Sequence, residues 1–406
     1  MMQNNQKIPE GWSVKKLSDL CSKISDGIHT TPKYVDKSEY HFINGNNLRD
    51  GHICIYEDTK CVSFEEYIKQ KQKLGTHTLL MSINGTIGSL ANYYNEDVVL
   101  GKSAAFMNFN DMQTKKYVYT ILQTNSTKRY FENELTGSTI KNLSLKSIKS
   151  MKILLPPLPE QEKIAGILGT WDEAIEKLSN LIEQKKLLKK GLMQKLLTGK
   201  TRLSGFTQPW KEVKLGEIFN IKKGQGLSKE VLDDNGLNKC ILYGELYTKY
   251  SEVIKDVESR TNQCEGILSQ IGDILIPAST TTTGIDLANA TSLLKEKVLL
   301  GGDINILRAK KEVSSIFFAY LLTHAYKFDI AKLAQGITII HLYGEFLKNM
   351  KIYIPSDTSE QQAIADVLST ADDEINLLNQ KLEALKEQKK GLMQQLLTGQ
   401  IRVKVN

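Results

Sequence analysis

The 406-residue sequence is short of the residues that build metal sites and disulfide scaffolds, with five cysteines and six histidines. No two cysteines have the two-residue gap of a zinc knuckle, and the histidines show no metal-ligand spacing. We therefore expect no metal site, and we expect reduced thiols rather than disulfides or metal ligands. The cysteines are Cys21, Cys54, Cys61, Cys240 and Cys264.

Long apolar runs are also absent. A membrane-spanning helix needs about 18 consecutive apolar residues, and no run in the chain approaches that length. The first residues, Met1 to Glu10, are polar and lack the apolar stretch of a signal peptide. We expect a cytoplasmic protein that makes no membrane contact.

Catalytic signatures are missing as well. An adenine methyltransferase would carry an Asn/Asp-Pro-Pro-aromatic tetrapeptide, but the only Pro-Pro pair lies in Leu155-Pro-Pro-Leu158. Gly101-Lys-Ser103 resembles the end of a P-loop, yet Glu96 replaces the required first glycine. Asp172-Glu-Ala-Ile175 resembles a helicase box, but it lies on a predicted helix, where we interpret it as surface charge. We therefore predict no catalytic residue and no cofactor on this chain.

The charge balance of the chain excludes few classes of function. Lysine and arginine number 53 against 46 aspartate and glutamate residues, a formal net charge of +7. A mild basic excess over a chain of this length permits nucleic-acid binding without requiring it.

What the sequence does contain is a duplication. Glu160–Gln161 recurs as Glu360–Gln361, an offset of 200 residues (360 − 160). Gly191–Gly199 recurs as Gly391–Gly399 at the same offset, with eight of nine residues identical. Repeats at constant register are the signature of a duplicated unit.

The repeat extends into the rest of each copy, where it is weaker. Trp12 matches Trp210, and Val98-Val-Leu-Gly101 resembles Val298-Leu-Leu-Gly301. Each copy therefore consists of a divergent mixed segment followed by a similar helical segment, which suggests one scaffold carrying two specificities.

The helical segments have the heptad spacing of a coiled coil. We predict a central helix within residues 157–202 and a C-terminal helix within 356–406. The seam residues are Ile164, Leu168, Ile175, Leu178 and Leu192 in the first and Ile364, Leu368, Ile375, Leu378, Leu382 and Leu392 in the second. Lys185, Lys189 and Lys389 interrupt the apolar seam.

A single amphipathic helix is marginal in water, so each seam needs a partner. The obvious partner for each helix is the helix of the other copy. We favour antiparallel over parallel pairing because a globular segment lies between the helices and would then occupy the opposite end of the rod. The alternative is that the helices serve only oligomerisation.

The remaining segments, residues 1–156 and 203–355, carry short β-type runs separated by Gly and Asn. We predict strands at 79–83 and 272–277, and helices at 114–122, 126–134 and 314–323. The expected fold class is α+β: two α/β domains with mostly β cores, separated by two long antiparallel coiled-coil helices and related by a pseudo-twofold repeat.

Loops on these domains are rich in Lys, hydroxyl and amide side chains. Lys, Ser and Thr suit phosphate oxygens, whereas Asn, Gln and Lys suit base edges. The alternative for each residue is an ordinary solvated turn. The candidate DNA contacts are His29, Thr30, Thr31, Lys33, Ser138, Thr139, Lys141 and Asn142 in the first domain and Lys222, Lys223, Gln225, Ser228, Lys229, Thr281 and Thr282 in the second.

Several motifs together resemble the specificity subunits of type I restriction–modification systems. They are Pro156-Pro-Leu-Pro-Glu-Gln-Glu-Lys-Ile-Ala165, the two Gly-Leu-Met-Gln-x-Leu-Leu-Thr-Gly helix ends, Pro9-Glu-Gly-Trp12 and Asp26-Gly-Ile-His29. The duplicated domain–helix order also fits, and the resemblance covers the whole chain.

The resemblance implies that residues 1–156 and 203–355 are target recognition domains, each reading one half of a bipartite double-stranded DNA site. It implies that the helices set the spacer and dock two modification subunits, which bind S-adenosylmethionine and methylate adenine. Restriction subunits would add ATP- and Mg-dependent translocation and cleavage. Two other functions stay open: a methyltransferase with fused target domains, and a coiled-coil scaffold without DNA contact.

Overall fold

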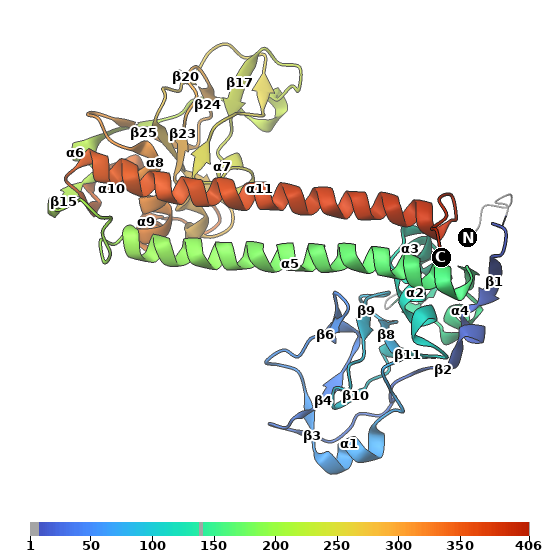
Figure 1. Ribbon diagram of the computed structural model, residues 1–406. Coiled ribbons are helices and arrows are strands. Elements are labelled where there is room, and N and C mark those ends of the chain that lie inside the picture. Colours follow the sequence, from blue (N-terminus) through green and yellow to red (C-terminus); the bar gives the residue numbers. More distant parts are fainter. Residues whose placement is uncertain (1–7, 138–140, 406) are drawn as a thin grey trace. The chain divides into compact units, whose positions relative to one another are not determined.

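The computed structural model describes residues 8–137 and 141–405 as a mixture of helices and strands with two long helices (Figure 1). These are α5 (Leu158–Leu196) and α11 (Thr358–Leu397). The chain divides into two compact units, unit 1 with residues 1–178 and 381–406 and unit 2 with residues 179–380. Each unit therefore contains a globular part and one portion of each long helix.

The globular part of unit 1 contains two four-stranded sheets, with strand orders β2-β11-β8-β9 and β10-β4-β7-β3. Pairs β1-β14, β5-β6 and β12-β13 complete it. The strands are β1 (Ser13–Lys16), β2 (Cys21–Asp26), β3 (Tyr34–Val35), β4 (Tyr40–Ile43), β5 (Leu48–Arg49), β6 (His52–Ile53), β7 (Cys61–Val62), β8 (Thr78–Ser82), β9 (Leu90–Asn92), β10 (Val98–Leu100), β11 (Ala104–Phe109), β12 (Leu135–Thr136), β13 (Asn142–Leu143) and β14 (Lys152–Leu155). The helices are α1 (Phe64–Gln70), α2 (Met112–Leu122), α3 (Asn125–Glu134) and α4 (Leu145–Ser150), with 3-10 turns η1 (Leu17–Leu20) and η2 (Gly45–Asn47).

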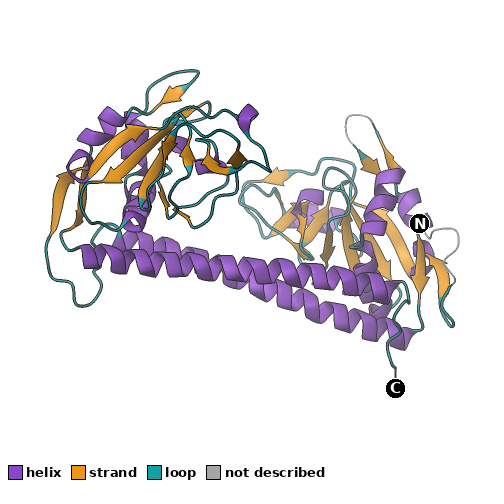
Figure 2. Ribbon diagram, turned by 90° about the horizontal axis from the view of Figure 1, so that it is seen from above, coloured by secondary structure: helices purple, strands orange, loops and turns teal. Residues whose placement is uncertain are grey.

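Unit 2 follows the same plan, with a five-stranded sheet of order β16-β25-β21-β23-β18 and a four-stranded sheet of order β19-β17-β24-β20. In each unit the strands gather in the globular part (Figure 2). The strands are β15 (Trp210–Lys214), β16 (Phe219–Lys223), β17 (Asn238–Ile241), β18 (Val253–Ile254), β19 (Arg260–Thr261), β20 (Ile267–Leu268), β21 (Asp273–Pro277), β22 (Ser279–Thr280), β23 (Thr291–Leu293), β24 (Leu299–Leu300), β25 (Ile304–Ala309), β26 (Ile340–His341) and β27 (Lys351–Pro355). The helices are α6 (Leu215–Ile218), α7 (Glu245–Thr248), α8 (Ser315–Tyr320), α9 (Lys327–Leu333) and α10 (Gly344–Asn349), with 3-10 turns η3 (Lys229–Val231) and η4 (Gly284–Leu287) and a π-turn η5 (Leu321–Ala325).

The local sequence accounts for these elements. Strands β8 and β21 are apolar runs in which every residue is buried, as expected for a strand covered on both faces. Helix α2 starts where the side chain of Asp111 accepts a hydrogen bond from the Thr114 amide, and the hydroxyl of Ser314 caps α8 in the same way. The helix predicted at 314–323 is not α-helical throughout, because α8 ends at Tyr320 and the chain continues as the π-turn η5.

The long helices contribute directly to the core of each unit. In unit 1, Ile164 and Leu168 of α5 belong to the same buried cluster as Met393 and Leu396 of α11. In unit 2, the cluster includes Ile364, Ala365 and Leu368 of α11 together with Leu196, the last residue of α5, and Leu197, which follows it. All eleven seam residues predicted from the sequence are buried or half-buried, so the seam faces protein rather than solvent.

A buried carboxylate joins the helices to the first strand of unit 1. Glu160 is 5% exposed, and its Oε2 accepts a hydrogen bond from the indole nitrogen of Trp12 at 2.7 Å. Its Oε1 lies 2.5 Å from Nη2 of Arg402, which follows α11. The guanidinium and the indole supply the donors that a buried carboxylate requires.

Unit 2 repeats the arrangement. Glu360 is fully buried, accepts from the indole of Trp210 at 3.3 Å and lies 2.6 Å from Nη2 of Arg202. The Trp and Glu-Gln repeats in the sequence therefore mark one structural device that is built twice.

Five backbone hydrogen bonds in each unit have the same pattern, and we call each set the backbone frame. In unit 1 the amides of Gly27, Ile28, Gly101, Ile83 and Leu143 donate to the carbonyls of Ala104, Leu100, Ile43, Ser103 and Ile83, over 2.8–3.1 Å. In unit 2 the amides of Gly224, Gln225, Gly301, Ala278 and Leu342 donate to the carbonyls of Ile304, Leu300, Ile241, Asp303 and Ala278, over 2.8–3.0 Å. The frame brings the loop after β2 or β16 beside the ends of the central strands.

Each frame needs glycine at its closest approach. A Cβ on Gly27 would lie 2.0 Å from the carbonyl oxygen of Leu100, and one on Gly224 would lie 2.0 Å from that of Gly301. Both neighbours are backbone atoms, which cannot rotate away. The loop would have to move to admit any side chain.

We predict that Gly27→Ala lowers the free energy of unfolding by about 1–3 kcal/mol or more, because overpacking forces the backbone apart. Gly75→Ala is the matched control in the same unit, since its Cβ would meet no atom within 4 Å. Denaturant unfolding of the full chain measures both. Equal stability of the two variants would contradict the frame.

Candidate nucleic-acid interface

The loop after β2 presents the first group of predicted DNA contacts to solvent. His29, Thr30, Thr31 and Lys33 are all exposed. Nε2 of His29 lies 2.8 Å from Oδ2 of Asp26, with the imidazole 70% exposed and the carboxylate largely covered. The aspartate thus orients a histidine whose other ring nitrogen is available to a ligand.

Beside this loop, the frame of unit 1 gathers neutral hydrogen-bonding side chains. The hydroxyl of Ser103 donates to Oδ1 of Asn44 at 2.8 Å and accepts from the Gly45 amide at 2.9 Å. Asn84 forms an antiparallel bridge with Asn142, a predicted contact that is half-buried. Amides and hydroxyls both donate and accept, as hydrogen bonding to base edges requires.

The same stretch of sequence holds three further predicted contacts, Ser138, Thr139 and Lys141. Lys141 is exposed. Ser138 and Thr139 lie outside the described residues. Sequence reasoning missed Asn44, Asn84 and Ser103, although the Asn-Gly turns at 44–45 and 84–85 and the Gly101 repeat mark their positions.

In unit 2 the corresponding loop is basic. Lys222, Lys223, Gln225, Ser228 and Lys229 are all exposed. Nζ of Lys223 lies 3.1 Å from Oδ1 of Asp303, so part of its charge is already balanced. Among residues 8–137 and 141–405, no carboxylate is within ion-pair range of Lys222.

The threonine-rich turn of unit 2 is partly occupied by its own hydrogen bonds. The hydroxyl of Thr282 donates to Oδ2 of Asp286 at 2.5 Å, and that of Thr283 donates at 2.9 Å. These bonds, that of Thr282 foremost, lower the pKa of Asp286. Thr283 is the N-cap of η4. Both predicted contacts, Thr281 and Thr282, are exposed, but the hydroxyl of Thr282 is held by Asp286.

A small hollow lies beside the basic loop of unit 2. Strand β22 pairs with β26, which sets Ser279 opposite His341, and the rings of His341 and Tyr343 stack at a centroid distance of 6.0 Å. The hollow has a volume of about 220 Å³. Its polar lining comprises Lys222, Lys223, Asn305, His341, Tyr343, Glu345 and Lys348.

A hairpin leads into β26. The backbones of Gln335 and His341 exchange hydrogen bonds of 2.9 and 2.7 Å. At the tip, Ile337 is fully exposed. This hairpin and the stacked His341–Tyr343 pair were not among the predicted contacts, because their proximity to Lys222 depends on pairing between distant strands.

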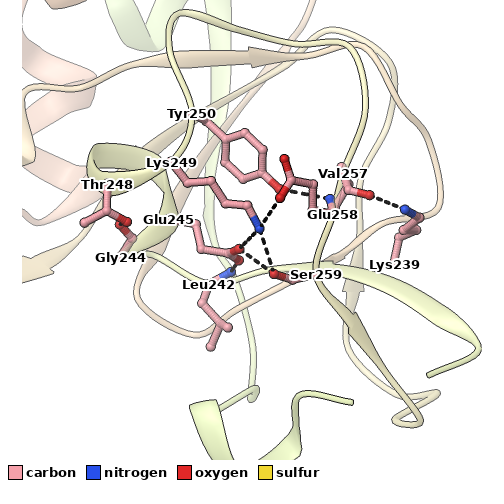
Figure 3. Close-up of polar contacts among 10 residues, drawn as sticks. All are labelled: Lys239, Leu242, Gly244, Glu245, Thr248, Lys249, Tyr250, Val257, Glu258 and Ser259. Carbon is pink, nitrogen blue, oxygen red and sulfur yellow. Dashed lines mark hydrogen bonds and ion pairs between the residues drawn. The ribbon is translucent and has the colours of Figure 1, made fainter. Parts of the chain in front are cut away.

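The segment after β17 is fixed by an ion-pair cluster (Figure 3). Oε1 of Glu245 accepts from the hydroxyl of Ser259 at 2.5 Å and from Lys249 at 3.3 Å, and Oε2 accepts from the Leu242 amide at 2.9 Å. Lys249 also lies 2.9 Å from Glu258. Because Lys249 is paired with two carboxylates, it stabilises the segment after β17, and its charge is largely balanced within the protein.

The two frames thus share a backbone and differ in side chains. Three amides and a hydroxyl border the frame in unit 1, whereas an aliphatic group, a hydroxyl, a carboxylate and an imidazole border it in unit 2. The matched positions are Asn44 and Leu242, Asn84 and Ser279, Ser103 and Asp303, and Asn142 and His341.

Two features are absent from residues 8–137 and 141–405. No group of three or more His, Cys, Asp or Glu side chains is placed to hold a metal ion. No helix in that part of the chain has the length and apolar character to cross a membrane.

Comparisons with known proteins agree on one family. The family model for the type I restriction modification DNA specificity domain matches residues 9–184 and again residues 207–387. A Methanocaldococcus jannaschii chain named as the MjaX type I restriction enzyme specificity subunit is 28% identical, over 98% of this chain and 95% of that relative. The MjaVIII specificity subunit of the same organism is 24% identical over the same shares.

Solved structures show the same fold. The S subunit of a type I restriction–modification system from Mycoplasma genitalium superposes with a TM-score of 0.62 at 18% identity, covering 98% of this chain and 97% of that chain. The family model accounts for most of this chain in two segments. The chain therefore belongs to the family of type I restriction–modification DNA specificity subunits.

Proposed function

We propose that this specificity subunit reads a bipartite, asymmetric site in double-stranded DNA, one half with the globular part of each unit. The observation that carries the proposal is the pair of backbone frames. Each frame presents its loops in the same way, but the side chains at four matched positions differ in hydrogen-bonding pattern and charge. One backbone with two side-chain sets suits recognition of two different sequences.

The chemistry of the exposed groups supports DNA as the ligand. Lysines at the end of β16 and in the loop after it, and threonines in the loop after β22, can contact phosphates, which supply affinity without sequence information. Asn84 and Asn142 in unit 1 and Gln225 and His341 in unit 2 can donate to and accept from base edges in a groove.

We propose further that α5 and α11 form an antiparallel coiled coil that sets the unread gap between the half-sites. The contacts within each unit support this pairing. In unit 1, Glu160 near the start of α5 is bound by Arg402 just beyond the end of α11. In unit 2, Arg202 just beyond the end of α5 binds Glu360 near the start of α11.

The partners belong to the same proposal. Two modification subunits would dock on the helices, carry S-adenosylmethionine and methylate adenine. Restriction subunits would add ATP- and Mg-dependent cleavage, and the assembly would act in the cytoplasm. The chain itself would be non-catalytic, directing the activity of the complex to its site.

The proposed function predicts that both half-sites are needed for tight binding. With modification subunits present, a duplex that retains both half-sites should bind at least about a hundredfold more tightly than one with either half scrambled, because the two contacts are tethered. A gel shift at fixed salt measures this. If scrambling one half leaves the affinity unchanged, the bipartite reading is wrong.

For a single side chain, we predict that Lys222→Ala weakens binding of specific and unrelated duplexes alike. Losing one phosphate contact should reduce the slope of log K against log salt by about one. Lys211→Ala is the matched control, since it removes an equal charge from the exposed strand β15. Equal effects of the two variants would argue against a phosphate contact at Lys222.

Shortening both helices together tests the spacer. Deletion of residues 175–181 together with 375–381 removes one heptad from each, about 10 Å of rod or about three base pairs of duplex. Sequencing of methylated adenines should show an altered gap, or loss of recognition, with unchanged half-site letters. Altered letters with the original gap would contradict the role of the helices as a spacer.

A further inference from the structure

Two lysines that are largely shielded from solvent interrupt the apolar seam of the long helices, and each meets an aspartate of the other helix. In unit 1, Lys389 of α11 is 7% exposed, and its Nζ forms an ion pair with Asp172 of α5. In unit 2, Nζ of Lys189 in α5 lies 2.5 Å from Oδ1 of Asp372 in α11. Asp172 and its counterpart therefore do more than the surface charge that the sequence suggested.

In unit 2 the ion pair extends to the globular part. The hydroxyl of Tyr320, in α8, donates to Oδ2 of Asp372 at 2.5 Å, and Nζ of Lys189 lies 5.3 Å from the centroid of the Tyr320 ring. Burial, reinforced by Asp372, raises the pKa of Tyr320. The phenol consequently remains a donor, and three segments meet at one aspartate.

Unit 1 has the corresponding arrangement. Nζ of Lys389 lies 3.4 Å from Oε1 of Gln123, which follows α2. Burial, reinforced by the charge of Asp172, raises the pKa of Tyr119 to about 12. An amide from the globular part thus accompanies the ion pair in this unit.

The two pairs specify one and the same register. Along α5, Lys189 follows Asp172 by 17 residues (189 − 172). Along α11, their partners Asp372 and Lys389 are also 17 residues apart (389 − 372), in the opposite order. Each unit therefore selects the same antiparallel alignment independently of the other.

An apolar heptad seam does not select its own register, because a shift of seven residues again places apolar side chains opposite apolar side chains. The lysines remove that freedom. A shift of seven would bring Ala165 or Ser179 to the place of Asp172 and Ala365 or Asn379 to the place of Asp372. None of the four offers a carboxylate, so a shifted seam would bury an unpaired ammonium group.

We propose that the Asp172–Lys389 and Asp372–Lys189 pairs are positioning residues that fix the axial register of α5 against α11 and thereby the number of unread base pairs between the half-sites. This inference rests on the proposed function. It assigns spacer selection to four named side chains rather than to helix length alone.

The test uses the full chain assembled with its modification subunits, with methylated adenines mapped on a library of duplexes that varies the gap. The central variant carries Lys189→Leu and Lys389→Leu, which leave a continuous apolar seam that still favours helix pairing. We expect methylation to spread over neighbouring gap lengths, with the share at the original gap falling several-fold and both half-sites unchanged in sequence.

A charge exchange provides the rescue. Asp172→Lys with Lys389→Asp, combined with Asp372→Lys and Lys189→Asp, restores an opposite charge at each position and should restore the original gap. The matched control exchanges Glu387 and Lys390, an exposed pair within α11 whose atoms lie 3.1 Å apart. That exchange should leave the gap distribution as it is.

A leucine variant that keeps the original gap alone, a charge exchange that fails to restore it, or altered half-site letters would each overturn the inference. The unaltered chain tests the proposed function separately. If its methylation shows no bipartite site at all, the function itself fails, whereas a sharp gap in the leucine variant refutes only the role of the ion pairs.

Discussion

A buried charge needs a partner of opposite charge, and in this protein such pairs join the two long helices within each unit. Glu160 and Glu360 are almost completely shielded from water, and each is held by a tryptophan and an arginine. Because desolvating a carboxylate is costly, each site tolerates few substitutions once it is formed. Both glutamates and both tryptophans accordingly recur at matched positions of the two copies.

The frames show how divergence is accommodated. Hydrogen bonds between backbone atoms do not depend on side-chain identity, except where a glycine admits a close approach, as at Gly27 and Gly224. The positions around them can therefore change freely, from Ser103 in one unit to Asp303 in the other. A fixed backbone with variable edges is well suited to presenting two different binding surfaces.

Much of the architecture is predictable from the sequence because its signals are local. The heptad spacing, the Glu-Gln repeats and the continuous apolar run of β21 each report on neighbouring residues. The contacts that position the candidate interface are not local. Asp172 meets a lysine 217 residues away, so on its own it resembles surface charge, and the two-residue strands around the frames are too short to show an alternation.

The candidate DNA contacts divide along the same line. Exposure of the lysines and hydroxyls in the loops after β2 and β16 follows from composition alone. The hydroxyl of Thr282 is exposed but already donates to Asp286, which its residue type does not reveal. The proximity of Asn44 to Ser103 depends on pairing between strands that are distant in the sequence. Residue type predicts what a side chain can bind, and tertiary structure decides whether it is available.

We propose that two unlike surfaces on one scaffold read two unlike stretches of DNA. Mapping methylated adenines in the host genome, with and without this gene, tests it most directly. We expect a gene-dependent motif of two different half-sites separated by a fixed unread gap. A palindromic or continuous motif, or methylation unaffected by loss of the gene, would contradict the account.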